Sequence, residues 1–111
     1  MDVKTHYDML IRENNDPFRD PPALQKYMEL WDGQTFLDQM ELDGSKTVLE
    51  IGVGTGRLAE KTARCCRHLT GIDLSPMTIA RARENLQDFL NISLICDDFK
   101  QHQFDETFDV I

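Results

Sequence analysis

VLEIGVGTGRLAE, residues 48–60, places three glycines, Gly52, Gly54 and Gly56, directly after an apolar run. Residues 47–51 have the composition of a buried β-strand, and apolar residues recur after the glycines with the spacing of a helix. A loop between a strand and a helix of this kind lies at the carboxyl end of a parallel sheet, where open α/β folds bind ligands. Because glycine has no Cβ, its backbone can approach a ligand closely. The stretch therefore predicts a ligand site built on bare backbone.

The rest of the second half of the chain continues the alternation of strands and helices. Further strands are predicted at 68–72, 92–96 and 108–111, and a second helix begins at Ser75 and Pro76, a natural N-cap followed by proline in the first turn. A helix is expected after the glycines, and the residues on its buried face are Leu58, Ala59, Thr62, Ala63 and Cys66. Such alternation predicts right-handed βαβ units, a parallel sheet and an α/β fold.

The first 45 residues have a different pattern. Apolar residues recur at helical spacing in residues 1–13 and again in 23–40, and three of the four prolines fall between them, in 14–22. The chain is therefore predicted to have an N-terminal helical cap segment, residues 1–45, followed by a βαβ unit, residues 46–111.

Composition limits the classes of function. The 111 residues suffice for one small domain, and 41% hydrophobic with 29% charged residues is typical of a soluble globular protein. No apolar run is long enough for a membrane span or a secretory signal, so a cytoplasmic protein is expected, with no membrane partner. The formal charge of −8 would repel phosphate backbones, and nucleic acid is not an expected partner.

Cysteine and histidine spacing does not favour a metal site. Cys65 and Cys66 are neighbours and Cys96 stands apart, so neither a disulfide framework nor a zinc site with two cysteine pairs is indicated, and free thiols are expected. The histidines also lack ligand spacing and are interpreted as surface or structural residues: His6, His68 and His102. No metal ligand is predicted.

The spacing of the glycines distinguishes two cofactor classes. A dinucleotide-binding fingerprint requires G-x-G-x-x-G, but Arg57 occupies the position of its third glycine, which disfavours a nicotinamide cofactor. The pattern Glu50-x-Gly52-x-Gly54-x-Gly56 instead resembles the first motif of the class I, Rossmann-like S-adenosylmethionine-dependent methyltransferases.

The resemblance continues at the second predicted strand. In that family this strand ends on an acidic residue that accepts hydrogen bonds from both ribose hydroxyls, and GIDLSPM places Asp73 there. The resemblance also implies that Leu74 and Met77 are the apolar residues that flank the adenine.

The third strand is followed by ICDDF, which is similar to the family motif at the adenine ring. The resemblance assigns Asp97 to the adenine amino group, the backbone amide of Asp98 to a ring nitrogen, and Phe99 to the wall of the same pocket. FDETFDVI, residues 104–111, resembles the entry into the fourth strand of the family.

The resemblance implies a three-layer Rossmann-like fold with N-terminal helices and strands 1–4 in the order 3-2-1-4. Relative to the seven-stranded family fold, this arrangement is truncated, so residues 46–111 would form an incomplete half-domain. We therefore expect a fragment that is inactive by itself and self-associates through the exposed edge of its fourth strand, at Phe108 to Ile111.

The resemblance further implies an S-adenosylmethionine-binding portion of a methyltransferase that acts on a small molecule. Glu50 would organise the methionine end of the cofactor, and the backbone of Gly52, Gly54 and Gly56 would contact its amino-acid portion. Tyr7 is a candidate lid residue. No catalytic residue can be assigned from the sequence. Two alternatives stay open, namely an NAD-dependent oxidoreductase domain and a non-catalytic S-adenosylmethionine-binding module.

Overall fold

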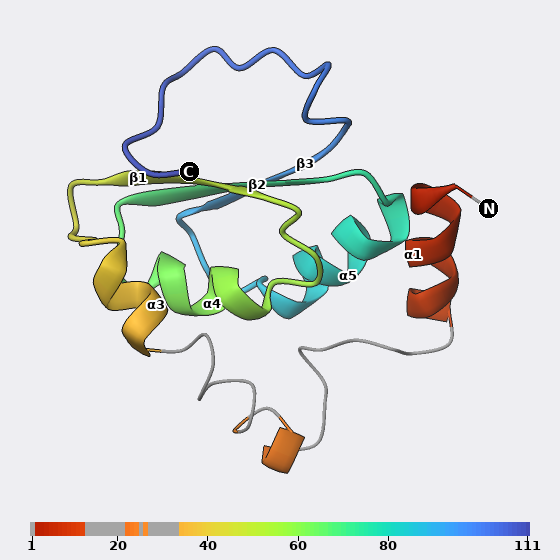
Figure 1. The fold of residues 1–111 in the computed structure, drawn as a ribbon, viewed down its shortest axis with the longest axis horizontal. Helices are drawn as coiled ribbons and strands as arrows, with labels where there is room; N and C mark the ends of the chain where they lie inside the picture. Colours follow the sequence, from red (N-terminus) through yellow and green to blue (C-terminus); the bar gives the residue numbers. More distant parts are fainter. Residues whose placement is uncertain (1, 13–21, 25, 27–33) are drawn as a thin grey trace.

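The computed structural model describes residues 2–12, 22–24, 26 and 34–111. Its helices and strands are, in chain order, α1 (Val3–Arg12), α3 (Gln34–Gln39), β1 (Thr47–Ile51), α4 (Arg57–Ala63), β2 (His68–Asp73), α5 (Pro76–Asn85) and β3 (Ile92–Cys96). Figure 1 shows α3, α4 and α5 on one face of the sheet and the segment after β3 on the other. The predicted α/β class is confirmed.

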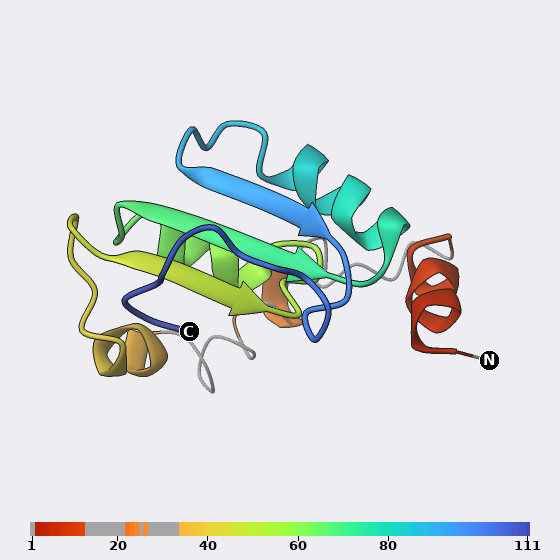
Figure 2. The same ribbon diagram turned by 90° about the horizontal axis from the view of Figure 1, so that it is seen from above.

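The strands form a parallel three-stranded sheet in the order β1-β2-β3. Val48 is opposite Leu69, and Leu69 is opposite Ile92. In Figure 2 the arrows of β1, β2 and β3 point the same way, toward the end of the sheet where α1 lies. The loops that follow β1 and β2 and the segment that follows β3 therefore all start at the same end of the sheet, where the strands have their carboxyl ends.

The predicted fourth strand and the order 3-2-1-4 are not confirmed. Residues 108–111 contribute one parallel bridge, between Val48 and Val110, and no strand. The amides of Asp109 and Val110 both donate to the carbonyl of Thr47, at 2.9 and 3.1 Å, and the amide of Leu49 donates to the carbonyl of Val110. The amide of Thr47 donates to Oδ2 of Asp109 at 2.8 Å and not to a backbone carbonyl, so the pairing does not extend back toward Phe108.

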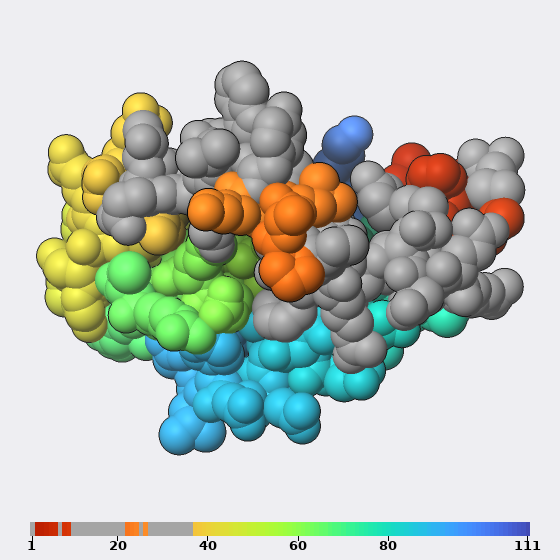
Figure 3. Space-filling model, turned by 90° about the horizontal axis from the view of Figure 1, so that it is seen from below, coloured from red at the N-terminus to blue at the C-terminus, as the bar shows by residue number. Residues whose placement is uncertain are grey.

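The core lies between the sheet and the layer formed by α4 and α5. Ala59 of α4 and Ile79 of α5 are fully buried and pack with Val48 and Leu69 of the sheet. Figure 3 shows this layer from outside, with α4 (green) beside α5 (cyan). The start of α5 is as predicted, since the Ser75 hydroxyl caps the helix by accepting a hydrogen bond from the amide of Thr78.

The predicted extent of the first helix of the βαβ unit is wrong at its C-terminal end. The apolar pattern runs to Cys66, but α4 ends at Ala63. The side-chain amide of Asn91 donates to the carbonyls of Ala63 and Cys66, at 2.8 and 3.3 Å, and so satisfies groups that a longer helix would pair internally. Cys66 is still buried in the core.

The N-terminal region is described in part. The helix expected in residues 1–13 is α1, which packs against α5, whereas residues 14–21 and most of 23–33 lie outside the described residues. Among the described residues, no helix combines the length and the apolar character needed to cross a membrane. The division into a cap segment and a half-domain stays a prediction.

Candidate functional site

A pocket of about 380 Å³ lies at the carboxyl ends of the strands. Most of the residues predicted to bind a cofactor line it: Gly52, Gly54, Asp73, Leu74, Asp97, Asp98 and Phe99. The remaining lining residues were not singled out from the sequence: Val3, Ile51, Ile72 and Lys100. Parallel pairing of β1, β2 and β3 brings these distant segments of the chain to one place.

The glycine loop exposes its backbone toward this pocket. Gly52 and Gly54 have φ values of 74° and 61°, which lie in the left-handed region that residues with a Cβ rarely adopt. A Cβ built on either residue would meet nothing within 4 Å. Gly56 differs, because its Cβ would lie 2.6 Å from Cδ1 of Leu86. Gly52 and Gly54 therefore leave open space, whereas Gly56 allows the start of α4 to pack against Leu86.

Asp73 ends β2 and connects the glycine loop to the start of α5. Its Oδ2 accepts a hydrogen bond from the amide of Gly54 at 2.9 Å, and its Oδ1 accepts one from the amide of Ser75 at 3.2 Å. An ionised carboxylate has about four acceptor positions. Each oxygen of Asp73 can therefore accept a further hydrogen bond while the carboxylate holds the loop.

Asp97 follows β3 and is held differently. Its Oδ1 accepts from the amide of Asp98 at 2.8 Å, and its Oδ2 lies 2.8 Å from Nδ1 of His102. The hydrogen bond with His102, and next the amide of Asp98, hold the pKa of the Asp97 carboxyl below its ordinary value. His102 was interpreted as a surface or structural residue, and its spacing from Asp97 matches no motif that would have identified the pair.

The apolar residues assigned to the adenine separate into two groups. Leu74 and Phe99 line the pocket and are 39% and 41% exposed, so their side chains are available for contact. Met77 does not line it, and its amide instead donates to Oδ1 of Asp8 at 3.3 Å.

Asp8 also connects α1 to the start of α5. Its Oδ1 accepts a hydrogen bond from the hydroxyl of Ser75, and α1 supplies Val3 to the pocket. No sequence signal identified Asp8. Tyr7, the candidate lid residue, belongs to α1, but its side chain lies outside the part of the chain that the structure describes.

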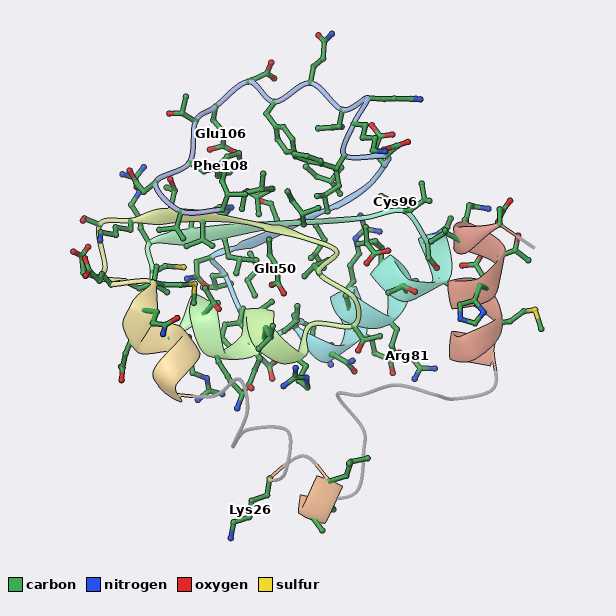
Figure 4. The ribbon with its side chains drawn as sticks, viewed as in Figure 1. Lys26, Glu50, Arg81, Cys96, Glu106 and Phe108 are labelled. Atoms are coloured by element: carbon green, nitrogen blue, oxygen red, sulfur yellow. The ribbon has the colours of Figure 1, made fainter. Side chains whose placement is uncertain are left out.

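Glu50 lies in a neighbouring pocket and not beside Asp73. This second pocket, of about 460 Å³, is lined by Glu50 and by apolar residues that include Met40 and Leu58, and it shares Gly52 with the first. Figure 4 shows Glu50 between the sheet and the helices below it. Burial raises the pKa of Glu50 to about 7, against the attraction of Arg57, and its buried Oε2 has no hydrogen-bond partner among the described residues.

The three cysteines have free thiols, with Cys66 buried and Cys65 and Cys96 exposed. Burial raises the pKa of the Cys66 and Cys96 thiols, which disfavours their reactive thiolate forms. Within the described residues, no group of three or more histidine, cysteine, aspartate or glutamate side chains is arranged to hold a metal ion.

Comparison with known proteins gives consistent matches. Residues 48–111 match the model of a family described as methyltransferase domain. Nodulation protein S of Rhizobium tropici is 32% identical over 98% of this chain and 47% of its own length. The rRNA adenine N-6-methyltransferase of Escherichia coli is 34% identical over 68 residues, which are 61% of this chain and 28% of that protein.

A solved structure matches most of the fold. Phosphoethanolamine N-methyltransferase 1 of Haemonchus contortus, in complex with phosphoethanolamine and S-adenosylhomocysteine, superposes with a TM-score of 0.74 and 25% identity. The match covers 96% of this chain and 23% of that chain.

The chain spans less than half the length of the curated relatives it matches here. An rRNA methyltransferase is among those relatives, so the expected exclusion of nucleic acid as a partner is not confirmed.

Proposed function

Because the chain belongs to the methyltransferase domain family, we propose that the pocket at the carboxyl ends of β1, β2 and β3 binds S-adenosylmethionine for methyl transfer. The observation that carries the proposal is one pocket lined by the bare glycine loop and by two aspartates from neighbouring strand ends, Asp73 and Asp97. Open space where Gly52 and Gly54 would carry a Cβ leaves room for a ligand against the loop.

Each end of the cofactor has a matching group in the pocket. The two acceptor positions left on Asp73 suit the paired ribose hydroxyls, and Asp97 suits the adenine amino group. Leu74 and Phe99 supply apolar contact for the adenine ring. The backbone of Gly52 and Gly54 would contact the amino-acid portion, and Glu50 would organise it from the neighbouring pocket, directly or through water.

The chemistry supplied by the bound cofactor is an electrophilic methyl group on a sulfonium. The residues of this chain hold the cofactor in place, and transfer then depends on an acceptor atom placed in line with the methyl group. Gly54 and Asp73 act together here, since the carboxylate fixes the loop through its hydrogen bond to the Gly54 amide. None of the described residues is assigned as a catalytic acid or base.

A small-molecule acceptor is the proposal we favour. The formal charge of −8 opposes binding to a nucleic-acid backbone, and the pocket lining includes the apolar residues Val3, Leu74 and Phe99. The neighbour of known structure was crystallised with phosphoethanolamine, a small molecule. An rRNA acceptor is the second candidate, because an rRNA methyltransferase is 34% identical over 68 residues.

The test is a methyl-transfer assay of the complete gene product with S-adenosylmethionine labelled in its methyl group. The acceptor panel contains small amines, carboxylic acids, phenols and quinone precursors, with ribosomal RNA as the alternative. We expect label in a small molecule and none in RNA. Label in RNA alone would overturn the acceptor class, and cofactor binding without label in any acceptor would favour a non-catalytic binding module.

A further inference from the structure

We propose that His102 is a positioning residue that fixes the Asp97 carboxylate to receive the adenine end of the cofactor. The inference rests on the proposed function and extends it to a residue outside the pocket wall. His102 does not line the pocket, but its Nδ1 lies 2.8 Å from Oδ2 of Asp97, which does. With Asp97 ionised, the imidazole Nδ1 must carry the hydrogen and donate it.

The His102 ring is itself held in place. It packs against the ring of Phe104 in a T-shaped arrangement, with a centroid distance of 4.6 Å and an interplanar angle of 67°. Phe104 in turn contacts Phe99 at 6.3 Å and Phe108 at 5.5 Å. The amide of His102 also donates to the carbonyl of Asp98 at 2.9 Å, so both the backbone and the ring are restrained.

These contacts belong to the segment that covers the face of the sheet opposite α4 and α5, drawn in blue in Figure 1. Phe99 lines the pocket and packs toward Phe104, so the aromatic cluster of Phe99, Phe104 and Phe108 links the pocket wall to the His102 ring. The cluster gives His102 a fixed support from which to hold Asp97.

Asp97 needs such a partner more than Asp73 does. The Asp97 side chain is 46% exposed, and an exposed carboxylate would otherwise rotate freely. One oxygen accepts from the amide of Asp98 and the other pairs with His102, which together fix the carboxylate plane. Each oxygen keeps an acceptor position, and a ligand that uses it does not have to order the side chain on binding.

The experiment separates the hydrogen bond from the packing of the ring. His102→Phe keeps an aromatic ring beside Phe104 but removes the donor, whereas His102→Asn keeps an N–H near the position of Nδ1. Affinity for S-adenosylhomocysteine is measured by calorimetry on the 111-residue chain. We expect His102→Phe to weaken binding about two- to tenfold, which is the cost of ordering one side chain. His102→Asn should stay within about twofold of the wild type.

A second ligand identifies the contact through which His102 acts. The analogue of S-adenosylhomocysteine that has hydrogen in place of the adenine amino group keeps the unprotonated ring nitrogen but cannot donate to Asp97. Its affinity should be the same for the wild type and for His102→Phe. In the background of Asp97→Ala, His102→Phe should cause no further loss of S-adenosylhomocysteine affinity, which tests the coupling even if His102→Phe perturbs the segment after β3.

His68 provides the matched control. Its Nε2 lies 2.9 Å from the hydroxyl of Ser93, at the opposite end of the sheet from the pocket, and His68→Phe should leave both affinities unchanged. Unchanged S-adenosylhomocysteine binding in His102→Phe, or equal losses for both ligands, would overturn the role of His102. Failure of the wild type to bind S-adenosylhomocysteine would instead overturn the proposed function, and this inference with it.

Discussion

Asp73 and Asp97 occupy equivalent places after neighbouring parallel strands, yet the chain holds them by different means. Asp73 is fixed by two backbone amides, of Gly54 and Ser75. Asp97 is exposed and takes one amide from its own turn and one side-chain partner, His102. The Asp73 carboxylate at the end of β2 is therefore coupled to the glycine loop, whereas the Asp97 carboxylate after β3 is held by groups of the segment that follows that strand.

A substitution in the glycine loop, which Asp73 holds, should have the largest effect on ligand affinity. Gly54→Val is expected to abolish measurable S-adenosylhomocysteine binding, because the side chain would fill the open space beside the loop. The φ of 61° adds a conformational cost of about 1 to 2 kcal/mol to the free energy of folding. Calorimetry and thermal unfolding measure the two effects, with Gly44→Val as control. Normal binding by Gly54→Val would show that the loop only connects β1 to α4 and does not contact the ligand.

Asp73→Ala should have the next largest effect on affinity. Two charge-assisted hydrogen bonds to ribose, worth roughly 1.5 to 3 kcal/mol each, correspond to at least a hundredfold loss of affinity. The same change also frees the amide of Gly54, so the fold of the variant is checked by circular dichroism. If the variant folds and binds like the wild type, the ribose assignment is wrong.

Glu50, the acidic residue of β1, adds a third carboxylate to the comparison of Asp73 with Asp97. It is buried and lines a different pocket from these two aspartates. Its folded-state pKa of about 7 exceeds the value expected when unfolded, so the unfolded chain loses the proton first as pH rises. The free energy of unfolding should fall by about 3 kcal/mol between pH 4.5 and 7.

Glu50→Gln should remove most of that slope and stabilise the chain at pH 8. Urea unfolding at several pH values measures the slope, and Glu106→Gln, at an exposed site, is the control. A slope that persists unchanged in Glu50→Gln would assign the titration to another group.

Gly56→Ala should have the smallest effect on ligand affinity, and its main effect should be on stability. Its Cβ would press on Leu86, which costs about 1 to 3 kcal/mol of stability, and its φ of 102° adds backbone strain, but the residue does not line the pocket. We expect a lower unfolding temperature with little change in S-adenosylhomocysteine affinity at a temperature where the variant is folded. A stable variant with weakened binding would show that Gly56 contacts the ligand.

The parts of the fold predicted well from the sequence were set by local signals. The bounds of β1 and β3 agree with the apolar runs, and α5 begins where Ser75 and Pro76 indicate. The clustering of Gly54 and Asp73 in one pocket also follows from the parallel topology that strand and helix alternation predicts.

The parts missed depend on contacts between distant residues. Asn91 is the capping partner at the early end of α4, because its side-chain amide donates to the carbonyl of Ala63. Asn91 is far along the chain from Ala63, so the sequence around α4 does not indicate this contact. The pairing of His102 with Asp97 is missed for another reason, because it depends on a turn in which the amide of His102 donates to the carbonyl of Asp98 and on packing of the His102 ring against Phe104, and no sequence motif marks either contact. Glu50 follows the pleat of β1 into the helical layer, and its role at the methionine end of the cofactor stays a prediction.

The most direct test of the account is calorimetric titration of the wild-type chain with S-adenosylhomocysteine and, separately, with NADH. Arg57 at the position of the third dinucleotide glycine and the paired aspartates of the pocket predict one binding site for S-adenosylhomocysteine and no heat of binding for NADH. Binding of NADH without binding of S-adenosylhomocysteine would contradict the account.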